Sequence, residues 1–270
     1  MDGSVKALKA GVWTGSDMKQ NWPKQIWIVR HGESAGNVAR DAADLAGHAR
    51  IDIAERDVDV ALSALGQQQS DALAAWFRDL PLSEQPDVIL ASPYKRAVRT
   101  AETIAQQLSA AKGLPVIVDE RLREKEFGVL DRLTRRGIEE LHPDQAEFRR
   151  ILGKFYHRPP AGESWCDVIL RLRSMLDTIS LHYADQRVLI VAHQVVVLCM
   201  RYIIENLSEE QILEIDRRGD VSNCGVTEYV ASSGKEVGGG LVMTRYNFIA
   251  PLIEAGALVT AQKDANVAAR

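Results

Sequence analysis

One short stretch, residues 26–37, constrains the fold more than any other part of the 270-residue chain. Its sequence is IWIVRHGESAGN, in which four apolar residues run without a break into a polar turn that contains a glycine. A continuous apolar run of this length is typical of a strand that is buried on both faces of a parallel sheet. Arg30 and His31 then lie at the carboxyl end of the strand, where open α/β sheets place their ligands. From this stretch alone, His31 is either a nucleophile or base beside a fixed cation, or an ordinary polar residue at a strand end.

Two later apolar runs have the same form and also end in polar residues. Residues 87–91 (DVILA) precede the segment SPYKRAVRTA, and residues 187–192 (RVLIVA) precede His193. Because the carboxyl ends of parallel strands meet at one edge of a sheet, we expect the polar residues after these runs to lie near His31.

The segment SPYKRAVRTA predicts the start of a helix. Ser92 and Pro93 suit the cap and the first position of a helix over residues 93–112, which places Arg96 in the first turn. A guanidinium there suits phosphate oxygens, because a helix N-terminus adds favourable amide dipoles. We expect the neighbouring Tyr94 to lie at the surface.

Composition and charge exclude several classes of protein. Hydrophobic residues make up 46% of the chain, and the net charge is -4, which argues against general nucleic-acid binding. No run approaches the roughly 20 apolar residues of a membrane span, and the first residues lack the apolar core of a signal peptide. Three widely spaced cysteines have no CxxC pairing, which favours free thiols, and no tight His/Cys spacing indicates a metal site. We therefore expect a cytoplasmic protein with no nucleic-acid, membrane or metal partner.

Four separated segments resemble the signatures of the histidine phosphatase superfamily, which includes cofactor-dependent phosphoglycerate mutases, fructose-2,6-bisphosphatases and broad-range acid phosphatases. They are RHGE followed by Asn37, SPYKRAVRTA with Arg96, LREKEFG with Glu124, and AHQ with His193. The resemblance covers about residues 26–230 and points to the acid phosphatase and fructose-2,6-bisphosphatase branches.

The resemblance implies an α/β fold of three layers, in which a mostly parallel central sheet has helices on both faces. It also implies a helical cap over the C-terminal strand edges, inserted at about residues 134–158. The phosphatase domain then spans residues 26–250, between an N-terminal extension (1–25) and a C-terminal tail (251–270) that has no chemical signal. Within the domain, residues 38–60 have no clean periodicity and predict a short helix followed by a surface loop near the site.

The resemblance also implies a mechanism. His31 attacks phosphorus and forms a phosphohistidine. Three cationic side chains neutralise the phosphoryl oxygens, namely Arg30, Arg96 and His193. Glu124 protonates the leaving group and then, as a carboxylate, helps water attack the phosphohistidine. Glu126 is the neighbouring rival for this role.

Three further residues are candidates for substrate binding. Asn37 adds a hydrogen bond, and Arg158 either reaches a second anionic group of the substrate or lies at the surface. Gln194 after the second histidine resembles the fructose-2,6-bisphosphatase branch, although Ala161 stands where that branch commonly has a lysine. Phosphoglycerate mutases usually carry polar residues where this chain has the apolar residues 195–198.

The sequence therefore predicts a phosphatase that hydrolyses phosphate monoesters of small molecules, with no cofactor. Its partner is a small phosphorylated metabolite or another phosphomonoester. Two alternatives stay open: phosphoglycerate mutase-type phosphoryl transfer, and a non-catalytic module that binds a phosphorylated ligand.

Overall fold

A computed structural model describes residues 21–108, 114–232 and 240–261. Within these ranges six strands form one sheet in the order β3-β2-β4-β1-β5-β6. The strands are β1 (Gln25–Arg30), β2 (Val88–Ala91), β3 (Val116–Val118), β4 (Arg187–Ala192), β5 (Val226–Ala231) and β6 (Leu241–Phe248). The first four run parallel, whereas β5 is antiparallel to both β1 and β6. The prediction of a mostly parallel central sheet is confirmed.

Helices connect the strands and extend beyond them. The described α-helices are α1 (Ala35–Leu45), α2 (Ala64–Asp79), α3 (Lys95–Leu108), α4 (Arg135–Leu141), α5 (Pro143–Tyr156), α6 (Trp165–His182), α7 (Gln194–Ile204), α8 (Glu209–Arg218) and α9 (Ala250–Glu254). Short 3₁₀ turns are η1 (Asp57–Asp59), η2 (Glu120–Leu122) and η3 (Gly128–Leu130). Within the described ranges, none of the helices combines the length and the apolar character needed to cross a membrane.

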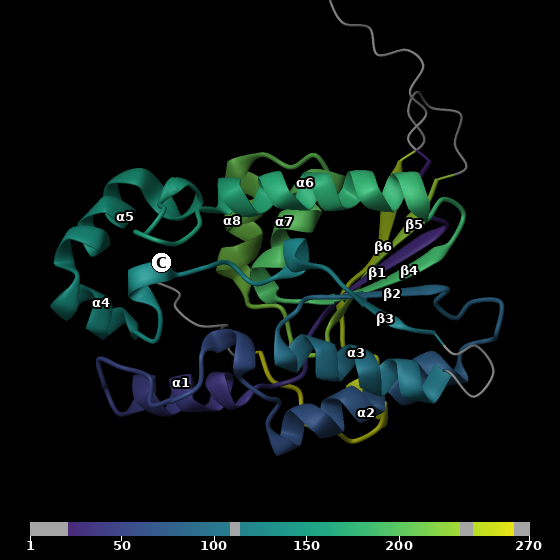
Figure 1. Ribbon diagram of the computed structural model, residues 1–270, viewed down its shortest axis with the longest axis horizontal. Coiled ribbons are helices and arrows are strands. Elements are labelled where there is room, and N and C mark those ends of the chain that lie inside the picture. Colours follow the sequence, from purple (N-terminus) through teal and green to yellow (C-terminus); the bar gives the residue numbers. More distant parts are fainter. Residues whose placement is uncertain (1–20, 109–113, 233–239, 262–270) are drawn as a thin grey trace, which may run out of the picture.

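Both faces of the sheet are covered, as the unbroken apolar runs require. In β1, Ile26 and Ile28 belong to a core shared with α6, α7 and α8. Trp27 and Val29 face the other way, into a core shared with α2 and α3. Figure 1 shows α6 and α7 on one side of the sheet and α2 and α3 on the other. Since successive residues of a strand point to opposite faces, a strand between two helical layers must be apolar at every position.

The predicted cap consists of α4 and α5, which stand at one end of the molecule in Figure 1. The Thr134 side chain caps α4 by accepting from the backbone N–H of Gly137. Pro143 begins α5, so the helical stretch divides at the proline as predicted. Gly153 interrupts α5 with a φ of 77°, a conformation that glycine adopts without strain.

Two local predictions around the second strand are wrong. α3 begins at Lys95, not at Pro93, because the carbonyl of Tyr94 accepts the first helical hydrogen bonds, from Ala97 and Val98. Tyr94 is also not a surface residue: only 5% of it is exposed. Its side chain turns inward instead, against the residues that form the site described below.

Candidate active site

Two histidines lie side by side at the ends of neighbouring strands. β1 and β4 pair in parallel with Arg30 opposite Ala192, so the residues after both strands emerge at the same edge of the sheet. The backbone N–H of His31 donates to the carbonyl of Ala192 at 3.0 Å. The imidazole rings of His31 and His193 consequently have centroids only 5.0 Å apart.

Hydrogen bonds assign the proton on the His31 imidazole. Its Nδ1 lies 2.6 Å from the carbonyl oxygen of Gly32, which can only accept, so Nδ1 carries the hydrogen. Its Nε2 accepts a hydrogen bond from Nε of Arg96 at 3.1 Å. His31 is therefore assigned as a neutral imidazole whose Nε2 lone pair faces a guanidinium.

Arg96 and His193 contact the His31 imidazole, and Arg30, its neighbour in the chain, is buried as well. Arg30 and His193 are fully buried, and 2% of Arg96 is exposed. One guanidinium nitrogen of Arg30 donates to the carbonyl of Val221, and Nε2 of His193 lies 2.7 Å from the hydroxyl of Ser92. The structure thus brings together residues from the ends of β1 and β4 and from the first turn of α3.

Tyr94 belongs to this cluster, contrary to the prediction from the sequence that it lies at the surface. Its ring packs edge-on against His193, with centroids 5.0 Å apart, and the Arg96 guanidinium lies 4.9 Å from the same ring. Its hydroxyl donates to Oε1 of Glu126 at 2.9 Å. Burial raises the pKa of Tyr94, and the Glu126 and Asp57 carboxylates raise it further. The phenol therefore stays protonated and serves as a hydrogen-bond donor.

The two candidate proton donors lie in different environments. Glu124 is buried, and its Oε1 accepts from the backbone N–H of Lys125 at 2.7 Å. Glu126 is half-exposed and is linked to the histidine pair through Tyr94. Glu124 is the carboxyl shielded from water, whereas Glu126 is the one that contacts both solvent and the cluster.

Asp57, which no sequence motif marks, lies directly against Arg96. Nη1 of Arg96 donates to the backbone carbonyl of Asp57 at 2.6 Å and to its Oδ1 at 3.0 Å, and Nη2 donates to Oδ2 at 3.3 Å. The residue lies in η1, within the loop that was predicted to follow a short helix near the site. No periodicity marks it, so its position depends on how the loop folds back.

Segments distant in sequence form hydrogen bonds and close packing contacts with the His31 loop. The side-chain amide of Asn223 donates to the carbonyl of His31 at 3.0 Å, and the hydroxyl of Thr260 donates to Oδ1 of Asn223 at 3.0 Å. Thr260 is buried, although its segment carries no motif that predicts a role in the site. Gly32 has no room for a side chain, because a Cβ there would lie 2.4 Å from the carbonyl oxygen of Gly66.

The three predicted substrate-binding residues lie in separate places. Asn37 is buried in the first turn of α1, and its Oδ1 accepts from both the backbone N–H and the hydroxyl of Ser34. Gln194 begins α7, and its amide donates to Oδ1 of Asp220 at 2.7 Å. Arg158 is the most exposed of the three, with 66% of its side chain accessible.

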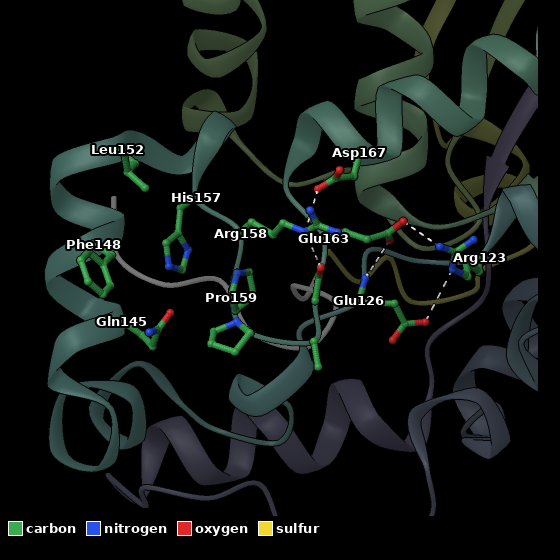
Figure 2. A pocket seen from close by; sticks show the side chains of 13 residues that line it. Arg123, Glu126, Gln145, Phe148, Leu152, His157, Arg158, Pro159, Glu163 and Asp167 are labelled. Atoms are coloured by element: carbon green, nitrogen blue, oxygen red, sulfur yellow. Dashed lines mark hydrogen bonds and ion pairs between the residues drawn. The ribbon is translucent and has the colours of Figure 1, made fainter.

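A cavity of about 820 Å³ opens between α5 and the loop that precedes α6 (Figure 2). Arg158 lies in it and forms an ion pair with Asp167 at 3.5 Å, while Arg123 donates to Glu163 at 2.7 Å. Glu126 also lines the cavity and links it to the histidine cluster. Paired charges line its wall, so the cavity suits a polar group. In the part of the chain that the structure describes, no cluster of three or more His, Cys, Asp or Glu side chains is suited to a metal ion.

The fold and the paired histidines define the class of this protein. Residues 26–238 match the family model of the histidine phosphatase superfamily, branch 1. The chain therefore belongs to this superfamily, as its motifs predicted.

Individual relatives include both mutases and phosphatases. A probable phosphoglycerate mutase GpmB from Erwinia tasmaniensis is 34% identical over 171 residues, which is 63% of this chain and 69% of that protein. The 6-phosphofructo-2-kinase/fructose-2,6-bisphosphatase of Gallus gallus is 29% identical over 70% of this chain, but only 34% of that protein is covered. Among solved structures, a mycobacterial glucosyl-3-phosphoglycerate phosphatase has a TM-score of 0.61 at 22% identity, covering 83% of this chain and 99% of that one. A putative alpha-ribazole-5'-P phosphatase from Escherichia coli has a TM-score of 0.65 at 18% identity, with 84% and 97% covered. These structures share the fold of this protein.

Proposed function

We propose that this protein is a phosphatase that hydrolyses phosphate monoesters of small molecules through a phosphohistidine intermediate. The protonation pattern of His31 carries this proposal. An imidazole with hydrogen on Nδ1 keeps its lone pair on Nε2, the atom that attacks phosphorus, and Arg96, which donates to that atom, supplies the charge that a phosphoryl group needs.

In the first step, Nε2 of His31 attacks phosphorus and the bond from phosphorus to the ester oxygen breaks. Arg30, Arg96 and His193 neutralise the charge on the three phosphoryl oxygens. Glu124, in its acid form, gives its proton to the departing alkoxide. In the second step, Glu124 takes a proton from water as that water attacks phosphorus. The bond from Nε2 to phosphorus then breaks, and inorganic phosphate leaves.

The direct test is hydrolysis of p-nitrophenyl phosphate together with chemical trapping of an acid-labile phosphoenzyme. We expect His31→Ala to abolish both the label and the turnover. His48→Ala is the matched control, because His48 lies on an exposed loop and should leave both unchanged. If the His31→Ala variant is still labelled normally, His31 is not the nucleophile.

A second comparison separates the two carboxyls near the site. We expect Glu124→Gln to slow phosphoryl transfer to poor leaving groups by about 10²-fold or more, while inorganic phosphate still binds. Glu126→Gln should retain most activity, because its amide oxygen can still accept from the Tyr94 hydroxyl and the ion pair it loses, with Arg123 at 3.7 Å, lies in the cavity wall. If Glu126→Gln loses activity and Glu124→Gln does not, the roles are exchanged.

Mutase-type transfer is the rival, and the names of the GpmB relatives favour it. The start of α7 favours hydrolysis, because Val196, Val197 and Leu198 stand where mutases usually carry polar residues and are completely or almost completely buried in the core. An isomerisation assay with 3-phosphoglycerate and a bisphosphoglycerate primer distinguishes the two activities. Hydrolysis without isomerisation supports the proposal.

We propose that Asn37, Arg158 and Gln194 contribute to substrate binding, with Arg158 placed in the cavity beside the site. The substrate is a small phosphorylated metabolite or a similar phosphomonoester. A screen of sugar phosphates, sugar bisphosphates and phosphoglycerates tests this assignment. We also propose a cytoplasmic location, which the three free cysteines support.

A further inference from the structure

The phosphoryl-binding guanidinium of this protein is bound by one of its own carboxylates. Nη1 and Nη2 of Arg96 each donate to a different oxygen of the Asp57 side chain, at 3.0 and 3.3 Å, and Nη1 also donates to the Asp57 backbone carbonyl. This bidentate arrangement is the geometry by which arginine commonly binds a carboxylate or a phosphate. The Arg96 side chain is 3% exposed and that of Asp57 is 26% exposed, so the ion pair is largely shielded from water.

A phosphoryl group and the Asp57 carboxylate compete for the same donors. Nε of Arg96 donates to Nε2 of His31, so a phosphoryl group that this nucleophile attacks must contact the same guanidinium, whose remaining donor nitrogens are Nη1 and Nη2. Those are the two nitrogens that Asp57 holds. A dianionic phosphate and a carboxylate placed there together would also repel each other strongly at this low exposure.

The segment that carries Asp57 is anchored at two points and loosely packed between them. Ile51 and Val60 are buried, and five of the eight residues between these two anchors are exposed. The 3₁₀ turn itself is short and is closed by the hydrogen bonds from Asp59 to Arg56 and from Val60 to Asp57. Few buried contacts mean a low free energy for local opening, so the turn can withdraw while its anchors stay in place.

We propose that Asp57 is an intramolecular occupant of the phosphoryl site, which the phosphate of a substrate must displace before His31 can attack. Asp57 thereby sets the affinity of the site for phosphate: it holds the guanidinium in place when the site is empty and opposes binding of the anion. The inference rests on the proposed function only in taking Arg96 as a phosphoryl-binding residue.

The experiment measures binding of inorganic phosphate to the full chain by isothermal titration calorimetry. We expect Asp57→Ala and Asp57→Asn to lower the Kd for phosphate by about ten-fold, because a competing charge-assisted hydrogen-bond pair is removed. The KM for p-nitrophenyl phosphate should fall by a similar factor. The matched control is Asp59→Asn in the same turn. Asp59 pairs with the exposed Arg56, so its loss should leave the Kd unchanged.

An unchanged or weakened affinity in the Asp57 variants would overturn the proposal and make Asp57 a structural support of Arg96. If Asp57→Ala fails to fold, the isosteric Asp57→Asn decides, because it removes the charge and keeps the shape. Phosphate binding is measured without turnover, so the inference and the proposed function fail separately. If the Asp57 variants bind phosphate more tightly but the protein hydrolyses no p-nitrophenyl phosphate, Asp57 is the occupant and the proposed phosphatase activity is refuted. If the protein hydrolyses p-nitrophenyl phosphate but the Asp57 variants bind phosphate with unchanged affinity, the phosphatase activity is supported and the role of Asp57 is refuted.

Discussion

Lys125 is buried beside Glu124, and the burial of its charge makes the free energy of folding less favourable. Only 5% of the residue is exposed, and its ammonium lies 4.5 Å from the centre of the Phe127 ring. Burial, and then the nearby Arg149 guanidinium, lower the pKa of Lys125 from 10.5 to about 8. A lowered pKa means that folding disfavours the charged form. At about 1.4 kcal/mol for each pKa unit, the penalty is about 3 kcal/mol at neutral pH.

Replacing Lys125 with methionine removes the charge and keeps an unbranched apolar side chain. We expect Lys125→Met to raise the free energy of unfolding by up to about 3 kcal/mol at pH 7, since both folded and unfolded wild-type chains carry the ammonium there. Between about pH 8 and pH 10.5 the wild-type folded state releases this proton before the unfolded state does. The wild type therefore gains stability relative to the variant as pH rises, and the difference should shrink across that interval.

The assay is urea unfolding followed by tryptophan fluorescence at several values between pH 7 and pH 10. Lys95→Met, at an exposed position in the first turn of α3, gives the baseline effect of the same change at the surface. A Lys125 variant that is less stable than the wild type at pH 7 would refute the reasoning. So would a stabilisation that grows with pH.

Three further changes test the contacts around the site. Thr260→Val removes the hydroxyl that donates to Asn223, so it should lower the free energy of unfolding by about 1–3 kcal/mol and reduce kcat. Thr260→Ser keeps a hydroxyl and should retain both the stability and kcat of the wild type. Equal behaviour of the two variants would contradict this prediction. Tyr94→Phe keeps the ring beside His193 but loses the hydrogen bond to Glu126. We expect kcat for p-nitrophenyl phosphate to fall less in Tyr94→Phe than in Tyr94→Ala. Equal losses of kcat would show that the ring contributes nothing. Gly66→Ala should lower the free energy of unfolding by more than about 3 kcal/mol, because its Cβ would lie 1.9 Å from the backbone oxygen of Glu33. Thermal or urea unfolding measures this change. A variant as stable as the wild type would contradict the close packing of the His31 loop on α2.

Local sequence patterns predicted the interior strands and the polar residues that follow them. A short unbroken apolar run that ends in a polar turn is typical of an interior strand, so the positions of β1, β2 and β4 were predicted from local pattern. Arg30, His31 and His193 come directly after such runs, and parallel strands end at one edge. Their convergence therefore required no knowledge of the loops.

Tertiary structure alone decided what surrounds these residues. Asp57 reaches Arg96 because a loop without periodicity folds back over the strand ends, and a carboxylate in such a loop looks like any solvated charge in the sequence. Tyr94 is buried by the second histidine and by Glu126, neither of which is a sequence neighbour. Thr260 supports the nucleophile loop only because the chain returns to it near its C-terminal end. Short-range patterns encode strands and helix starts through local sterics and burial, whereas contacts between loops distant in sequence exist only once the core has fixed where those loops begin and end.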